Sequence, residues 1–207
     1  MTKYKNIHQA VSDNSTKLCK VPGCTNNRSR VSGYCIKHTS QNNRFGHPQH
    51  RRILKNEYEI ERDECREIVM KNINHEGIKS AVKFIDDWLQ AAWDERPGVV
   101  SPDHFRRLYD AGVKGLDILI ECCALWLFHE RRPRRIYDNR HLTYVMGNRI
   151  IRISPYWAKV TGPEHRAVGQ HLRNNIGAIF VGVSHAVDKK ERVDNERRMA
   201  MSTPLEV

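Results

Sequence analysis

The chain has 207 residues, enough for one or two domains, and 39% of them are hydrophobic, which allows a packed core of moderate size. No apolar run reaches the roughly 18 residues that a bilayer crossing needs. The polar first ten residues also lack the apolar stretch of a signal peptide. These features argue against a membrane protein and predict a soluble, cytoplasmic one.

The formal charge of +11 is unevenly distributed along the chain. Residues 1–50 contain eight basic and one acidic residue (+7), and residues 130–166 contain nine and three (+6). Residues 51–129 contain twelve basic and fifteen acidic residues (−3). Two basic segments on either side of an acidic one favour a polyanionic partner, with nucleic acid first and an acidic protein surface second.

The first fifty residues divide into two parts. Residues 1–16 are polar, and we expect a flexible lead-in there. Residues 17–50 contain several glycines and prolines but few large apolar side chains, so this stretch cannot bury enough surface to fold alone. A bound metal would supply the missing stability.

Three cysteines and a histidine in this stretch have the spacing Cys19-x4-Cys24-x10-Cys35-x2-His38. Thiolates and an imidazole are ligands that Zn²⁺ favours, at the four corners of a tetrahedron. A Pro-Gly pair between the first two cysteines lets the chain turn so that both face one ion. The sequence therefore predicts one structural zinc ion in a module formed by residues 17–50.

The zinc-ligand motif resembles small zinc modules of bacteriophage proteins, several of which occur in or beside HNH-type endonucleases. Those modules usually end Arg-x-Gly-Asp-Pro, whereas residues 44–48 read Arg-Phe-Gly-His-Pro, with His47 in place of the aspartate. Residues 39–40 are Thr-Ser where an aromatic residue often follows the histidine. The resemblance covers only this short stretch and implies a phage-encoded protein in the bacterial host cytoplasm. His47 or His50 remains an alternative zinc ligand.

From residue 51 the apolar pattern becomes helical, which predicts a helical domain over residues 51–189 and a polar tail over residues 190–207. Apolar side chains recur at three- and four-residue spacing in several stretches, including residues 77–94 and residues 141–153. Residues 116–128 are apolar almost without interruption, which predicts the central helix of a bundle.

Two helix starts carry recognisable capping signals. Ser101 precedes Pro102, and Thr161 precedes Glu164 by three positions, as in a capping box. The complete pattern predicts a mainly α protein, with a small N-terminal zinc-binding knuckle followed by an all-α bundle of five or six helices.

The sequence contains no evident catalytic constellation. An HNH nuclease would need a histidine base beside a group that binds a divalent metal. Asp103-His104 is the only Asp-His pair, and no suitable asparagine and histidine follow it. An acidic residue is also favoured in the first turn of a helix, where these two residues would lie. We therefore predict that the protein is not an enzyme.

Residues 130–140 carry four arginines in five positions, divided by Pro133. Such a run cannot pack in a core, so it forms either a solvated loop or a loop that contacts phosphates. Arginine suits bidentate phosphate recognition. The predicted nucleic-acid contacts are Arg28, Arg30, Lys37, Arg44, Arg131, Arg132, Arg134, Arg135 and Arg140.

These features predict a zinc-containing protein that binds nucleic acid, with DNA favoured over RNA, in replication, transcription or genome handling. The alternative is a protein-binding module that docks on an acidic surface of a host enzyme, such as a polymerase, or serves in a larger assembly. The acidic residues 51–129 also permit self-association, because they complement the basic segments.

Overall fold

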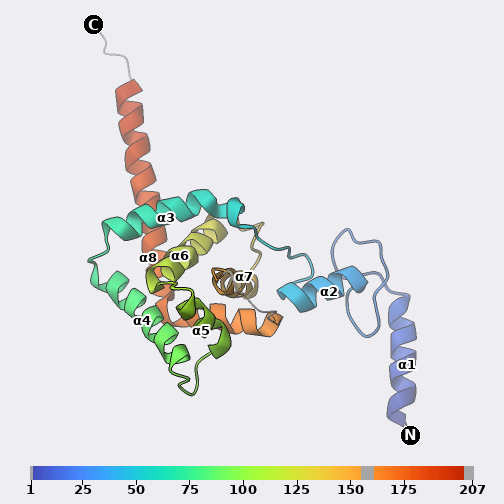
Figure 1. The fold of residues 1–207 in the computed structure, drawn as a ribbon. Coiled ribbons are helices and arrows are strands. Elements are labelled where there is room, and N and C mark those ends of the chain that lie inside the picture. The colour runs from blue at the N-terminus through green and yellow to red at the C-terminus, as the bar shows by residue number, and fades with distance from the viewer. Residues whose placement is uncertain (1, 155–160, 203–207) are drawn as a thin grey trace.

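The computed structural model describes residues 2–154 and 161–202, and these residues are mainly helical. The elements are α1 (Thr2–Ser15), α2 (Ile36–Phe45), the 3-10 turn η1 (Lys55–Tyr58), α3 (Glu59–Lys71), α4 (Glu76–Trp93), α5 (Pro102–Asp110), α6 (Gly115–Arg131), α7 (Asn139–Ile151) and α8 (Gly162–Ser202). Helices α3 to α8 form one bundle, and α2 connects the N-terminal part to it (Figure 1). The predicted fold class, a small knuckle followed by an α-helical bundle, is confirmed.

Helix α6 lies at the centre of the bundle because it is apolar on every side. It packs against α3, α4, α7 and α8, and Leu119, Leu125 and Phe128 are fully buried. The adjacent Cys122 and Cys123 are also buried and form no disulfide, so they act as small core residues. No helix in the described part of the chain has the length and hydrophobicity that a membrane crossing requires.

Helices α7 and α8 approach each other so closely that only glycine fits at two crossing points. A Cβ atom on Gly147 would lie 1.8 Å from the His165 carbonyl oxygen, and one on Gly169 would lie 1.9 Å from that of Thr143. This backbone contact brings the first turn of α8 against α7. It therefore fixes where the start of α8 lies relative to α7.

The two predicted helix starts differ in how they are capped. Thr161 and Glu164 form the predicted capping box, with Thr161 N donating to Glu164 Oε2 at 3.0 Å and Glu164 N donating to Thr161 Oγ1 at 3.4 Å. Ser101 does precede α5, but its side chain caps no backbone group and instead contacts Glu164 Oε1 at 3.5 Å. Asp103 lies in the first turn of α5, as the sequence indicates.

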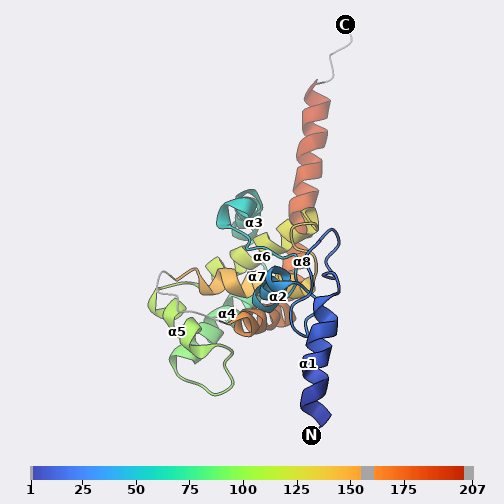
Figure 2. The same ribbon diagram turned by 90° about the vertical axis from the view of Figure 1, so that its right-hand side faces the viewer.

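The expectation of a flexible lead-in over residues 1–16 differs from the structure, in which residues 2–15 form α1. Polarity predicted exposure correctly, but a stretch without glycine or proline can still be helical. The end of α1 is fixed because Asn14 Nδ2 donates to the carbonyl oxygens of Arg30 (2.7 Å) and Ser32 (2.6 Å). Figure 1 shows α1 beyond the module and away from the bundle, and Figure 2 views α1 and the module from that side.

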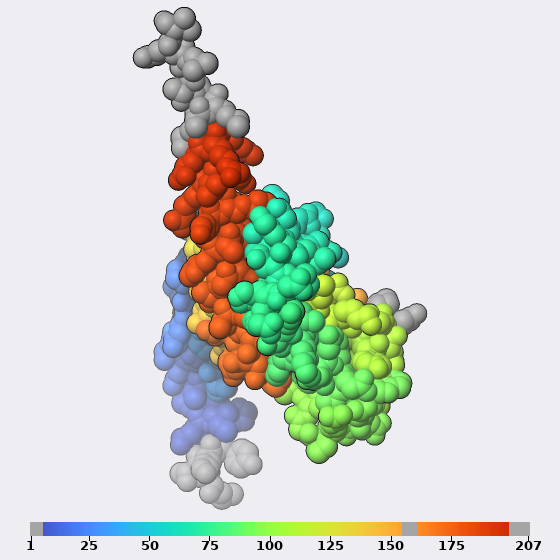
Figure 3. All heavy atoms as spheres, turned by 90° about the vertical axis from the view of Figure 1, so that its left-hand side faces the viewer, coloured from blue at the N-terminus to red at the C-terminus, as the bar shows by residue number. Residues whose placement is uncertain are grey.

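The predicted polar tail over residues 190–207 is helical as far as Ser202, because α8 continues to that residue. Lys190 forms an ion pair with Glu67, and Glu191 forms one with Arg131, so the first residues of the tail are held against the bundle. The rest of α8 projects beyond the other helices (Figure 3). Residues 203–207 lie outside the described residues.

Candidate metal centre and basic surfaces

Cys19, Cys24, Cys35 and His38 come together as the sequence predicts. Their ligand atoms all lie within 4.8 Å of one another, and no other such group occurs in the described ranges. His38 Nδ1 is 3.3 Å from Cys19 Sγ and 3.4 Å from Cys35 Sγ, while the Cys24 and Cys35 sulfur atoms are 3.9 Å apart. These four side chains could therefore hold a metal ion.

Local structure positions the four side chains. The chain turns after Val21, whose carbonyl oxygen accepts from Cys24 N at 3.1 Å. Gly23 occupies the left-handed region (φ 75°), which favours glycine. Cys35 immediately precedes α2, so His38 lies in the first turn of that helix and faces back toward the thiols.

The electrostatics of the group favour a cation between the thiols. Burial raises the pKa of Cys19, but N–H groups of Val21 and Cys35 and the ring of His38 more than offset this and lower it to about 6. At Cys24, a bond from the Asn26 N–H lowers the pKa, yet burial and the neighbouring cysteines raise it overall. A second thiolate is disfavoured beside the first, and a bound metal ion would remove that penalty.

His47 and His50 do not join the metal group. The His47 and His50 rings have centroids 4.2 Å apart, and His50 stacks on His141 with centroids 3.3 Å apart. The Tyr137 ring stacks against both His47 and His50 at 5.4 Å. These rings connect the segment after α2 to α7, so the alternative zinc ligands serve as contacts between the module and the bundle.

Arg131, the first arginine of the predicted phosphate-contacting loop, is held by carboxylates of the bundle. Its Nη1 lies 2.5 Å from Glu64 Oε2 in α3, and its Nη2 lies 2.8 Å from Glu191 Oε1 in α8. Glu64 is partly buried, whereas Glu191 is exposed. Arg131 therefore stabilises the packing of α3 against α8.

Arg132 and Arg135 are also paired within the chain. Arg132 Nη2 lies 3.2 Å from Glu61 Oε1, and Glu61 is almost fully buried. Arg135 forms an ion pair with Glu57. Arg134 is exposed and forms no ion pair with another described residue. The acidic residues of η1 and α3 thus neutralise most of this loop, which leaves less charge for phosphate than the sequence alone indicates.

The basic residues of the zinc module have different surroundings. Arg28 is used locally, since its Nε donates to the Leu18 carbonyl oxygen at 3.0 Å. Arg30 and Arg44 are exposed and line a shallow hollow together with small polar residues of α2. Lys37 is exposed beside a second hollow that reaches the metal group. Arg30, Lys37 and Arg44 are therefore available to a partner.

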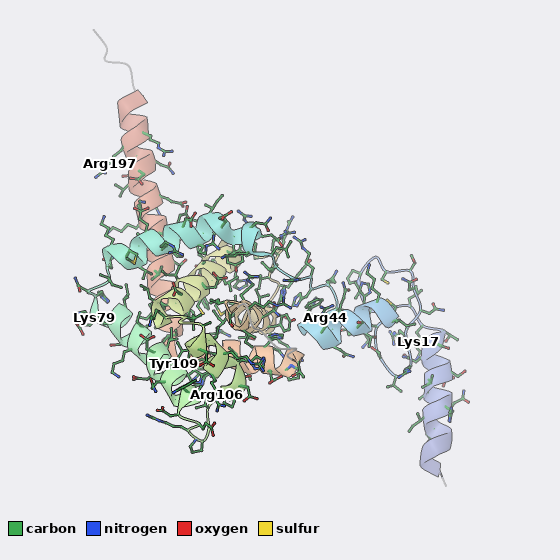
Figure 4. All side chains as sticks on the ribbon, in the orientation of Figure 1. Lys17, Arg44, Lys79, Arg106, Tyr109 and Arg197 are labelled. Atoms are coloured by element: carbon green, nitrogen blue, oxygen red, sulfur yellow. The ribbon has the colours of Figure 1, made fainter. Side chains whose placement is uncertain are left out.

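The fold also assembles a group of arginines that sequence reasoning recognised only in part. We call it the junction cluster; its members are Arg44, Arg52, Arg140, Arg152 and Arg166. Its centre is the buried Tyr144 of α7, whose ring meets Phe45 of α2 edge-on with centroids 5.6 Å apart. Arg44 lies at the end of α2 that faces the bundle (Figure 4).

The sequence identified two of these arginines, Arg44 and Arg140, as candidate contacts. It missed Arg52, Arg152 and Arg166, because they lie in separate segments of the chain. The only sequence signal was the excess of basic residues between positions 130 and 166, which includes Arg152 and Arg166.

Comparisons with protein-family models, with curated proteins and with solved structures found no match to this chain. The resemblance to phage zinc modules depends on the short motif in residues 17–48 and stays a prediction. The metal group and the basic surfaces are therefore the features of this chain that bear on its function.

Proposed function

We propose that the protein is a zinc-containing nucleic-acid-binding protein that acts by binding rather than by catalysis. The observation that carries the proposal is the basic module built on the metal group. Residues 1–50 contain a single acidic residue, Asp13, and they present exposed Arg30, Lys37 and Arg44 around four convergent ligands.

Zinc fits the ligand distances. A tetrahedral zinc ion with typical bond lengths would place two sulfur ligands about 3.8 Å apart and a sulfur and a nitrogen about 3.6 Å apart. The corresponding separations are 3.9 Å for Cys24–Cys35 and 3.3 and 3.4 Å for the two sulfur–His38 pairs. Four protein ligands leave no position for a reactive water, so the ion would be structural.

The module surface suits a phosphate backbone. Arg30 and Arg44 lie on one hollow with hydroxyl and amide side chains between them, among them Ser40 and Asn43. Arginine forks and neutral donors of this kind make most phosphate contacts in nucleic-acid complexes. The motif resemblance adds a biological setting, namely a phage-encoded factor in replication, transcription or genome handling, with DNA as the favoured ligand.

The test is fluorescence anisotropy with a labelled duplex DNA, its single strand and the matching RNA at two salt concentrations. The double variant Arg30→Gln/Lys37→Gln should weaken binding about tenfold and reduce the salt slope by about 1.8 on duplex DNA, since each lost contact removes about 0.9. The control Lys79→Gln/Lys83→Gln removes equal charge from α4, where both lysines pair with surface acids, and should bind as the wild type does.

Absence of salt-sensitive binding to all three ligands would overturn the proposal. In that event, a host-lysate protein that stays bound after nuclease treatment would favour the alternative, in which the module docks on an acidic enzyme surface.

A further inference from the structure

Two arginines of the junction cluster meet at Gly46, the residue that ends α2 in the left-handed conformation (φ 85°). A Cβ atom at this position would lie 3.4 Å from Arg140 Nε and 3.6 Å from Arg166 Nη1. Arg140 is the second residue of α7, and Arg166 is the fifth residue of α8. The fold thus brings two guanidinium groups from separate helices to one point on the module.

No carboxylate among the described residues pairs with either of these two arginines. In the described part of the chain, no ion pair involves Arg44, Arg52, Arg140 or Arg166. Arg166 Nη1 is buried and has no hydrogen-bond partner among the described residues. The segment 155–160, which precedes α8, contains no Asp or Glu in its sequence.

The acidic residues nearest in sequence are already engaged. Asp138 caps α7 by accepting from His141 N at 2.7 Å. Glu164 accepts from the backbone N–H and hydroxyl of Thr161, both at 3.0 Å. The loop arginines Arg131, Arg132 and Arg135, predicted phosphate contacts, have carboxylate partners. By contrast, Arg44, Arg52, Arg140 and Arg166 form no ion pair with another described residue.

Burial and the neighbouring charges both lower the pKa of two cluster arginines. Burial lowers the pKa of Arg166, and Arg140 lowers it further. Burial likewise lowers the pKa of Arg152, and Arg52 adds to the effect. Like charges held this close destabilise the folded chain unless an anion lies between them. Arg44, Arg52 and Arg140 are exposed, so an anion can reach the cluster from solvent.

We propose that the junction cluster is a binding site for backbone phosphates of a nucleic acid, with Arg140 and Arg166 as its principal contacts. The proposal rests on the function proposed above, because it extends the same surface. Arg44 belongs both to the module hollow and to the cluster, so one strand can run from Arg30 across Arg44 to the bundle.

The start of α8 supports the same ligand. Gly162 lies against the end of α2, where its Cβ position is 3.0 Å from the Arg44 carbonyl oxygen. The positive end of the α8 dipole therefore lies beside the cluster, and helix N-termini favour phosphate groups. Planar guanidinium forks match the oxygen atoms of a phosphodiester in a bidentate manner.

The test compares Arg140→Gln/Arg166→Gln with the wild type and with the charge-matched control Lys79→Gln/Lys83→Gln. Anisotropy with the tightest-binding nucleic acid should show about tenfold weaker binding for the cluster variant, and a salt slope lower by about 1.8 if the ligand is a duplex. A second arm measures thermal unfolding of the full chain in phosphate against chloride at equal ionic strength. Phosphate should raise the Tm of the wild type and the control more than that of the cluster variant.

The outcomes separate the two proposals. A folded cluster variant that binds nucleic acid as the control does, and gains as much Tm from phosphate, would overturn the inference. If Arg30→Gln/Lys37→Gln weakens binding while the cluster variant does not, the module function stands and the cluster site is wrong. If the wild type binds no nucleic acid, the proposed function fails and the inference fails with it, even if inorganic phosphate stabilises the wild type selectively.

Discussion

The imidazole rings of His50 and His141 stack with their centroids 3.3 Å apart and an interplanar angle of 18°. Both side chains are fully buried, His50 in the segment after α2 and His141 in the first turn of α7. This stack, together with Phe45 on Tyr144, joins the zinc module to the bundle. The module therefore ends in a packed contact and not in a free linker.

The first prediction concerns the effect of low pH on the free energy of unfolding. Burial lowers the pKa of His50 to about 4 and that of His141 to about 2, against 6.5 for an unperturbed histidine. The unfolded chain therefore binds more protons below about pH 6.5, and the free energy of unfolding should fall as the pH drops from there to about 4. The two histidines together contribute a slope of up to about 2.7 kcal/mol per pH unit.

Urea unfolding followed by circular dichroism at several pH values measures this slope. Replacing one member of the stack, as in His141→Gln, should reduce the slope, whereas His8→Gln, on the exposed face of α1, should leave it unchanged. Equal slopes in the wild type and His141→Gln would show that the stack does not titrate as described.

The second prediction concerns the metal. A chelator should unfold residues 17–50 and leave the α3–α8 bundle largely helical, because the module has a small core of its own around Cys19, Val21 and Cys35. Metal analysis should find one zinc ion per wild-type chain and none in Cys35→Ser. Cys65→Ala, a buried cysteine of the bundle, should keep its zinc. Loss of nearly all helical signal on chelation would show that the module and the bundle fold as one unit.

The third prediction concerns the close crossing of α7 and α8. Gly147→Ala should lower the free energy of unfolding by about 1–3 kcal/mol or more, because the new methyl group meets a backbone carbonyl that cannot move without shifting α8. Gly182→Ala, on the exposed side of α8 with open space around it, should raise stability by about 0.5–1 kcal/mol. Denaturant unfolding measures the change in the free energy of unfolding for both variants. Similar changes at the two sites would contradict the close approach of α7 and α8 at Gly147.

Features encoded by neighbouring residues could be predicted from the sequence. The four ligand residues lie within a stretch of twenty, and the capping box needs only Thr161 and Glu164, so both follow from spacing. The central position of α6 follows from its apolar composition. Each of these signals is local, and the structure agrees with each.

Features that depend on distant partners could not be predicted. Arg135 pairs with Glu57, which lies 78 positions away, so a run of arginines that looked free for phosphate is largely neutralised. Arg52, Arg140 and Arg166 come together only because α7, α8 and the segment after α2 meet. Polarity in residues 1–16 and beyond residue 190 indicated exposure, but it could not distinguish an exposed helix from a loose segment.

The most direct test of the central claim is an anisotropy titration of the zinc-loaded wild type with duplex DNA, single-stranded DNA and RNA over a range of salt concentrations. Binding through Arg30, Lys37, Arg44, Arg140 and Arg166 predicts a logarithmic salt slope of about −4.5 on duplex DNA, from five contacts at about −0.9 each. Absence of binding to all three ligands at low salt, or binding that does not change with salt, would contradict the account.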